Sequence, residues 1–187
     1  MSFDPLVLQA MARWPDVPAV YGWLRLDRRG GWHLIDRGRP GFDETLHGRG
    51  SPITSPPILD FIARNYASDE QGRWFWQNGP QRVFVDLDAA PWVLRVLGEG
   101  AQATLITHTG QIFGPVTAAA VDSEGGLLLA SAQACGIVHD LDAGALALDE
   151  DEPGQASLQI AGRRLALEVC ADPAARFGFC QRPRSKG

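Results

Sequence analysis

The sequence contains few cysteines, and their number is odd. Cys135, Cys170 and Cys180 are the only three in 187 residues, and no two of them share a CxxC spacing. The first residues also lack the charged segment and long apolar run of a signal peptide. An odd cysteine count without an export signal is typical of reduced thiols in a cytoplasm. We therefore expect a cytoplasmic protein, with Cys135 held inert by its apolar neighbours.

Long apolar runs and clustered positive charge are missing too. No stretch reaches the roughly 18 apolar residues that a membrane-spanning helix needs. The formal net charge is -5, whereas a protein that binds nucleic acid needs a concentrated basic surface. Neither a membrane nor a nucleic acid is therefore an expected partner. The sequence leaves open whether the partner is a small molecule or another protein, and it does not indicate an oligomeric state.

Common catalytic and cofactor-binding motifs are absent as well. The sequence has no GxxxxGK loop, no GxSxG elbow and no HExxH pair. Residues 98–103, GEGAQA, carry the glycines of a dinucleotide fingerprint, but a strand-like segment follows where that fingerprint requires a helix. A hairpin turn explains these glycines better. The four histidines are scattered, so we predict no metal site, no cofactor and no assigned catalytic residue, although distant ligands can converge on zinc.

Helical signals occur in three segments. Residues 4–12 begin with a capping Asp4 and a proline, and residues 55–66 begin with a capping Ser55 and two prolines. A weaker helix is predicted over residues 140–150. In the second segment the apolar stripe consists of Ile58, Leu59, Ile62 and Tyr66.

Alternating patterns and turn residues predict strands over most of the remaining chain. Hairpins are expected from residues 21–26 with 31–35, 73–77 with 82–88, and across 157–169. Further strands are expected at 92–97, 103–108, 116–121 and 126–130. Residues 36–54 are expected to form a long loop, residues 149–152 (DEDE) a solvated loop, and residues 181–187 a frayed tail.

Recurrence of a glycine followed by a strand, with one helix candidate in each half, favours an α+β fold built from a duplicated unit. We expect residues 1–20 to form a short N-terminal helix and a linker. Residues 21–89 and 90–187 are then expected to form the first and second units.

Trp74 and Trp76 are the first candidates for a ligand site, because they share one face of the strand at 73–77. The opposite face carries Arg73 and Gln77, so the alternation directs both indoles inward. They are either core residues or the rim of a pocket, with Arg82 or His108 nearby to fix a polar group.

The sequence allows two roles for each of three further residues. His108, in THTGQ, is either a turn residue hydrogen-bonded to its neighbours or a ligand contact. Asp86 and Asp88 point the same way on a strand, where they are either solvated or available for acid–base chemistry.

Over residues 21–111 the sequence resembles a proteobacterial family, domain-of-unknown-function family twelve eighty-five (DUF1285). The resemblance lies in the order of GGWH, SPITSPPILDFIARNY, DEQGRWFWQNGPQRVFVDLDAAPWV and LITHTGQ. It implies two similar units, each an antiparallel β-meander curled around one helix. It also implies a role in sensing or signal transduction, without any assigned catalytic residue.

These observations favour a non-enzymatic module that binds a small molecule or acts in regulation or signalling, through Trp74, Trp76, Arg82 and His108. Two alternatives remain open. One is a hydrolase-like or other enzyme that uses Asp86, Asp88 and His108. The other is a structural or protein-interaction module.

Overall fold

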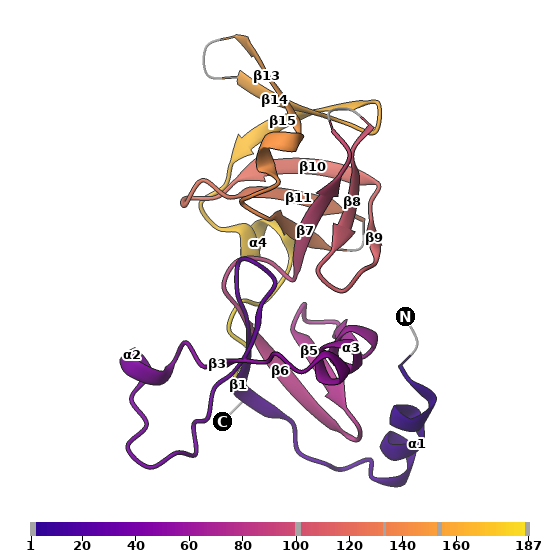
Figure 1. Ribbon diagram of the computed structural model, residues 1–187, viewed down its shortest axis with the longest axis vertical. Coiled ribbons are helices and arrows are strands. Elements are labelled where there is room, and N and C mark those ends of the chain that lie inside the picture. Colours follow the sequence, from indigo (N-terminus) through magenta and orange to yellow (C-terminus); the bar gives the residue numbers. More distant parts are fainter. Residues whose placement is uncertain (1–2, 100–101, 133, 153–154, 186–187) are drawn as a thin grey trace. The chain divides into compact units, whose positions relative to one another are not determined.

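The chain forms two compact units in the computed structural model, which describes residues 3–99, 102–132, 134–152 and 155–185 (Figure 1). The first unit comprises residues 1–27, 31–88 and 179–187, and the second comprises residues 28–30 and 89–178. The sequence-based division into residues 21–89 and 90–187 differs from this one at residues 28–30, which belong to the second unit. The N-terminal helix and residues 179–187 both belong to the first unit. Among the described helices, none has the length and apolar character needed to cross a membrane.

Six strands form the mixed sheet of the first unit, in the order β3-β2-β1-β6-β5-β4. Neighbours are antiparallel except β1 and β6, which run parallel, so two three-stranded meanders are joined side by side. The strands are β1 (Val20–Leu26), β2 (Trp32–Leu34), β3 (Ser51–Pro52), β4 (Tyr66–Ser68), β5 (Trp74–Asn78) and β6 (Gln81–Leu87).

Helix α3 (Pro56–Arg64) covers one face of this sheet and lies beside β5 in Figure 1. Ile62 is fully buried, and burial of such a side chain contributes about 1.5–3 kcal/mol. The helix ends at Arg64, before the expected end at residue 66, and Tyr66 already belongs to β4. The expected apolar stripe is also only partly buried, because Ile58 is 44% exposed.

The first unit also contains a helix as long as α3 and a shorter one. Helix α1 (Pro5–Arg13) follows Asp4, whose backbone N–H donates to Asn65 Oδ1 at 3.0 Å. The segment 36–54, expected to be a loop throughout, contains α2 (Glu44–His47) as well as β3. Asp43 makes this helix possible, because its side chain accepts a hydrogen bond from the backbone N–H of Leu46.

Residues 179–185 pack against β6 and correct two expectations. Asp86 is not solvated, since only 4% of its side chain is exposed, and Arg184 Nη1 lies 2.8 Å from Asp86 Oδ1. Arg182 lies 3.5 Å from Asp88, which also pairs with Arg25. The described part of the tail is therefore held by ion pairs, because two carboxylates on one strand face attract its two guanidinium groups.

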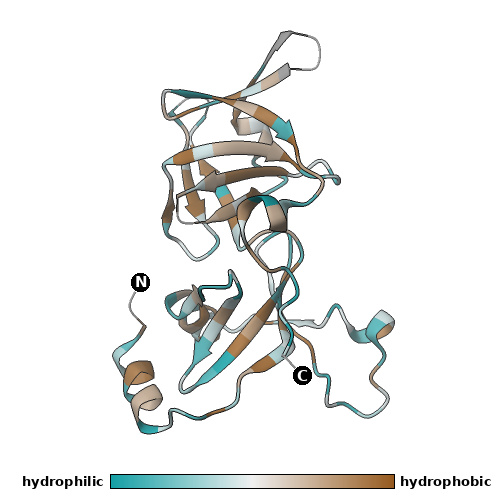
Figure 2. Ribbon diagram, turned by 180° about the vertical axis from the view of Figure 1, so that it is seen from behind, coloured by the Kyte–Doolittle hydropathy of each residue, from teal (hydrophilic) through white to brown (hydrophobic). Residues whose placement is uncertain are grey.

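Nine strands form the mixed sheet of the second unit, in the order β13-β14-β15-β10-β11-β12-β7-β8-β9. Its fully buried side chains include Leu94, Leu128, Leu129 and Leu158, and several of its strands are coloured as hydrophobic in Figure 2. The strands are β7 (Trp92–Leu97), β8 (Thr104–Thr107), β9 (Ile112–Phe113), β10 (Val116–Val121), β11 (Leu127–Ser131), β12 (Cys135–Val138), β13 (Ala147–Glu152), β14 (Gln155–Ile160) and β15 (Arg163–Val169).

The prediction of a helix over residues 140–150 is wrong. That segment forms a single 3-10 turn, η2 (Ala143–Ala145), and then enters β13. The DEDE segment is consequently a strand and not a loop, because Asp149 pairs with Ser157 and Leu148 with Leu158. Cross-strand pairing with β14 thus outweighs the acidic composition of this segment. A short helix, α4 (Pro173–Phe177), follows β15.

The two sheets share one topology. The order β9-β8-β7-β12-β11-β10 repeats β3-β2-β1-β6-β5-β4, including a single parallel pair in the middle, β7 with β12. Positions from β4 to β6 match positions from β10 to β12 at a constant shift of 53 residues: the pair Phe75–Phe84 matches Leu128–Ile137, and Tyr66–Trp76 matches Ala119–Leu129. The units differ at the helix, since only Gly114 and Pro115 separate β9 from β10.

The same turn also recurs at this shift. Between β4 and β5, Asp69 Oδ1 accepts hydrogen bonds from the backbone N–H groups of Gln71 and Arg73. Between β10 and β11, Asp122 Oδ1 accepts from Glu124 and Gly126 in the same way. Gly72 and Gly125 have φ of 68° and 80°, which favours glycine at this position.

Candidate ligand-binding site

Three aromatic rings in contact form a wall on the face of the first sheet that α3 does not cover. Tyr21 and Phe84 stack with ring centroids 4.6 Å apart, and Phe75 meets Phe84 edge-on at 5.8 Å. Phe75 and Phe84 are buried, so both faces of the sheet are covered. Phe75 lies on the face of β5 that carries Arg73 and Gln77, and alternation alone cannot show that a strand is buried on both sides.

Two arginines lie over these rings. The guanidinium carbon of Arg73 is 4.7 Å from the centroid of Phe84, and that of Arg82 is 4.1 Å from the centroid of Phe75. Such cation–π contacts hold a guanidinium in a fixed plane. Asp69 also pairs with Arg73 at 2.7 Å, and its hydrogen bond raises the pKa of Arg73. No carboxylate among the described residues pairs with Arg82.

These side chains border a cavity of about 430 Å³, which we call the first-unit cavity. Small-molecule sites typically have volumes of roughly 300–1,000 Å³ and combine apolar walls with a few polar groups. The lining contains two guanidinium groups and no carboxylate. It consists of Met11, Trp14, Pro15, Val17, Ala19, Tyr21, Arg73, Gln77, Pro80, Arg82 and Phe84.

Gln77 supplies the buried polar group of this cavity. Its side chain is 1% exposed, and its Nε2 donates to the backbone carbonyl of Gly79 at 3.0 Å. Its Oε1 is buried, and no described residue donates a hydrogen bond to it. A buried acceptor without a donor costs about 1–3 kcal/mol. Gln77 therefore brings to the lining a buried acceptor that no described donor satisfies.

Trp74 and Trp76 occupy the other face of β5, so Arg82 is separated from both indoles by the sheet. Trp74 is 7% exposed and contacts Tyr66, whereas Trp76 meets Phe61 of α3 edge-on at 5.8 Å. Neither indole lines the first-unit cavity. Trp74 lies in the core, as alternation indicated, whereas Trp76 is half-buried; Nε1 of Trp76 is itself buried with no acceptor among the described residues.

His108, the fourth predicted site residue, belongs to the second unit. Its Nδ1 accepts a hydrogen bond from the backbone N–H of Val93 at 3.2 Å, and its ring lies 5.7 Å from that of Trp92. It occupies the tight turn from Thr107 to Gln111. These contacts are those of a turn histidine that fixes its own neighbours.

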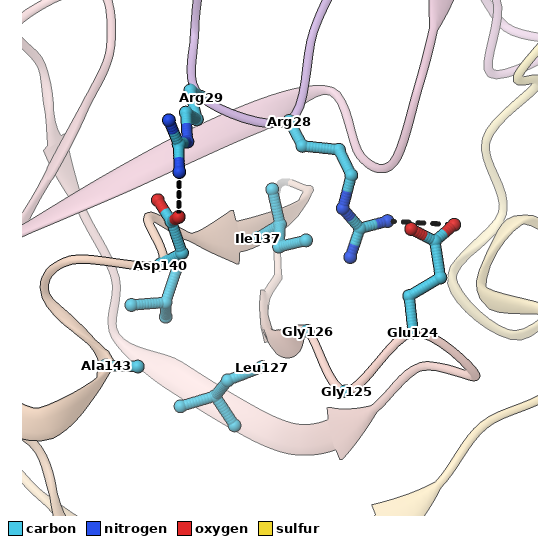
Figure 3. A pocket seen from close by; sticks show the side chains of 10 residues that line it. Arg28, Arg29, Glu124, Gly125, Gly126, Leu127, Ile137, Asp140 and Ala143 are labelled. Atoms are coloured by element: carbon cyan, nitrogen blue, oxygen red, sulfur yellow. Dashed lines mark hydrogen bonds and ion pairs between the residues drawn. The ribbon is translucent and has the colours of Figure 1, made fainter.

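The second unit has its own cavity, of about 310 Å³, with glycines and apolar side chains in its floor (Figure 3). Arg28 and Arg29 lie at two sides of it and point toward carboxylates. Arg28 pairs with Asp122 at 2.7 Å and with Glu124 at 3.7 Å, and Arg29 pairs with Asp140. Since each guanidinium already has an anionic partner, this cavity presents no uncompensated charge to a ligand.

The equivalent positions of the two units show which features the fold itself requires. Arg73 corresponds to Gly126, and the guanidinium of Arg28 lies beside Asp122 as that of Arg73 lies beside Asp69. In contrast, Gln77 corresponds to Ala130 and Arg82 to Cys135. The second sheet thus forms without an amide or a cation at these two positions. Gln77 and Arg82 are therefore special to the first unit.

Other reactive groups do not gather into a site. Among the described residues, no three His, Cys, Asp or Glu side chains lie close enough together to hold a metal ion. Burial raises the pKa of the Cys135 thiol to about 12, which fits the inert role expected from its sequence. Asp86 and Asp88, the carboxylates of the alternative enzyme hypothesis, both pair with arginines.

Sequence reasoning identified Arg82 but missed Gln77, Arg73, Tyr21 and Phe84. The available signal was the density of large apolar side chains on both alternating sets of β5 and β6. A strand that is aromatic on both faces is buried on both faces. A polar side chain within such a strand therefore indicates either a buried hydrogen bond or a site.

Comparisons with known proteins agree with this fold. A family model named DUF2944, described as a protein of unknown function (DUF2946), matches residues 3–184. No curated protein matches the chain.

Two crystal structures of DUF1285 family proteins are similar. One, from Silicibacter pomeroyi DSS-3, is 20% identical and has a TM-score of 0.53, covering 89% of this chain and 96% of the other. The second, from Shewanella baltica OS155, is 11% identical with a TM-score of 0.42, covering 64% and 85%. The first of these confirms, at the level of the fold, the resemblance drawn from the sequence.

Proposed function

The chain belongs to the DUF2944 family of proteins of unknown function, and we propose that it is a non-enzymatic regulatory or signalling module whose first unit binds a small molecule. The observation that carries this proposal is the composition of the first-unit cavity. Its walls are aromatic and aliphatic, and its polar groups are Gln77, two arginines and Tyr21. These groups can bind and orient a ligand.

The same composition argues against catalysis at this site. General acid–base and nucleophilic catalysis require groups such as His, Asp, Glu, Cys or an activated Ser. None of these lines the cavity, where Tyr21 is the one lining side chain that can donate or accept a proton. An arginine stays protonated at physiological pH and cannot act as a base. A site that binds without transforming its ligand fits a sensor better than an enzyme.

Native mass spectrometry of freshly purified protein, combined with ligand-observed NMR against a fragment library, tests this proposal. We expect a retained small molecule or fragment hits that bind the wild type. Ala19 lines the cavity, and Ala19→Phe fills part of its volume, so it should abolish that binding without lowering the melting temperature.

A matched control fills a position elsewhere. Ala143→Phe alters the second-unit cavity and should leave binding to the first unit unchanged. Hits that persist in Ala19→Phe would place the ligand outside the first-unit cavity. The absence of any bound molecule or hit would remove the proposal.

A further inference from the structure

The first-unit cavity is a cationic site in a chain whose net charge is -5. Two of its side chains are arginines, but their situations differ. Asp69 compensates the charge of Arg73 at 2.7 Å. Arg82 is half-buried over Phe75, and within the described residues no carboxylate forms an ion pair with it. Arg82 is thus the guanidinium available to an anionic ligand.

A second, independent observation lies directly across the strand pair. Gln77 is opposite Arg82 in the register of β5 and β6, and its buried Oε1 has no described donor. Side chains opposite each other on adjacent strands start about 4.5–5.5 Å apart. One small molecule can therefore reach both groups, presenting an anion to Arg82 and a hydrogen-bond donor to Gln77.

The walls define the body of this molecule. Tyr21 and Phe84 offer stacked rings, Trp14 stands half-exposed beside them, and Pro15 and Pro80 add flat apolar surface. Aromatic walls of this kind favour planar ligands through offset stacking and edge contacts. A volume of about 430 Å³ is at the small end for ligand sites, which suits one ring system with short substituents.

We propose that the first-unit cavity takes a small aromatic carboxylate that carries an N–H or O–H donor. The carboxylate pairs with the guanidinium of Arg82, the ring packs against Tyr21 and Phe84, and the donor bonds to Oε1 of Gln77. This inference rests on the proposed function, since it names the ligand class of the same cavity. The fixed plane of Arg82 over Phe75 favours a planar, two-oxygen partner.

The experiment measures binding by ligand-observed NMR for four matched sets of probes. The first set holds aromatic carboxylates with a donor, 4-hydroxyphenylacetate and indole-3-acetate. The second holds their methyl esters, the third the amines tyramine and tryptamine, and the fourth phenyl phosphate. We expect carboxylates to bind at least about tenfold more tightly than their esters, because an ester has no negative charge to pair with the guanidinium of Arg82.

Variants assign the contacts. Arg82→Gln should weaken carboxylate binding about tenfold or more, while Arg82→Lys, which keeps the charge, should weaken it less. Gln77→Met should remove the preference for 4-hydroxyphenylacetate over 4-methoxyphenylacetate. Arg39→Gln is the control: it alters an exposed arginine outside the cavity and should leave the binding of every probe unchanged. Melting curves of each variant show whether the fold is retained, and the Lys variant remains informative where Gln is poorly folded.

The outcomes separate the two proposals. Esters or amines that bind as well as the carboxylates, or phenyl phosphate binding alone, overturn the ligand class. If Ala19→Phe still abolishes such binding, the proposed function stands. Carboxylate binding that Arg82→Gln leaves unchanged also overturns the inference. If no probe binds the wild type, the inference fails, and the proposed function then depends only on the wider fragment library.

Discussion

Asp86 holds a carboxylate that is almost removed from water, and the nearest cation comes from a distant part of the chain. Arg184 reaches it at 2.8 Å and Arg182 at 3.9 Å, although both arginine side chains are half-exposed. A buried charge deprived of its partner is strongly destabilising, but exposure of the partner and a second arginine reduce this cost. The ion pair therefore matters because it compensates a buried charge.

We expect Arg184→Gln to lower the free energy of unfolding by about 1–2 kcal/mol, less than the full cost of breaking a buried pair. Urea denaturation measures the loss. Arg176→Gln is the control, since Arg176 and its partner Glu168 are both exposed, and it should cost less than about 0.5 kcal/mol. Equal losses in the two variants would mean that Asp86 does not depend on Arg184.

The thiols provide a second test at the residue scale. The raised pKa of Cys135, about 12, keeps this thiol protonated at pH 8, and only a thiolate reacts rapidly with alkylating reagents. Iodoacetamide at pH 8 should therefore modify the half-buried Cys180 before Cys135, as read by peptide mapping. Cys135 should react only after denaturant is added. Rapid alkylation of Cys135 in the folded protein would contradict its burial.

Helix α3 shows how far sequence patterns reach at the element scale. Its start after Ser55, with two prolines in the first turn, and the burial of Ile62 were predictable because these prolines and helical spacing are local properties, although Ser55 makes no side-chain capping hydrogen bond. Exposure of Ile58 was not predictable, since it depends on where the sheet ends beneath the helix. For the same reason, alternation located β5 and β6 but did not show that Phe75 and Gln77 are buried.

The pair Ile62 and Ile58 provides a test within this single helix. Ile62→Ala should lower the free energy of unfolding by about 2–5 kcal/mol, the range for a large-to-small change in a core. Ile58→Ala, at a side chain that is 44% exposed, should change it by less than about 1 kcal/mol. Chemical denaturation measures both. A loss below about 0.5 kcal/mol for Ile62→Ala would show that α3 does not cover the core.

On the scale of the whole molecule, the two units repeat one topology with different chemistry. The recurrence of a glycine followed by a strand favoured a duplicated unit from the sequence, although the second helix candidate used with it, residues 140–150, was wrong. The topological match itself was not predictable, because the units share little sequence and the helix occurs in only one of them. The candidate site was also hidden, since it depends on Gln77 and Arg82 facing each other across a register that only the fold reveals.

We expect substitutions in the two equivalent turns to have similar effects, each confined to its own unit. Each of the variants Asp69→Ala and Asp122→Ala removes a carboxylate. That carboxylate accepts two hydrogen bonds from backbone N–H groups and one from an arginine side chain. Each variant should lower the free energy of unfolding by about 1–3 kcal/mol. Hydrogen exchange should accelerate in β4 and β5 for the first variant, and in β10 and β11 for the second. Acceleration in both units from either single change would contradict this prediction.

The acid dependence of these turns follows from the direction of their pKa shifts. Although burial raises the pKa values of Asp69 and Asp122, hydrogen bonds from arginine and backbone groups outweigh it, and both values fall below normal. Their stabilising contribution is therefore present above about pH 4, the range of an unfolded Asp, and is lost as pH falls further. Acid titration of the two Ala variants should show a weaker dependence below pH 4 than the wild type.

The pairing of Asp86 with Arg184 has a consequence for synthesis of the protein on the ribosome. The two residues are 98 positions apart, and the strands β7 to β15 are made between them. At a translation rate of about 5–20 residues per second, Arg184 is synthesised on the order of ten seconds after Asp86. During that interval the second unit can fold, while β6 still carries an uncompensated carboxylate. The first unit, although it is translated first, is thus the later one to be completed.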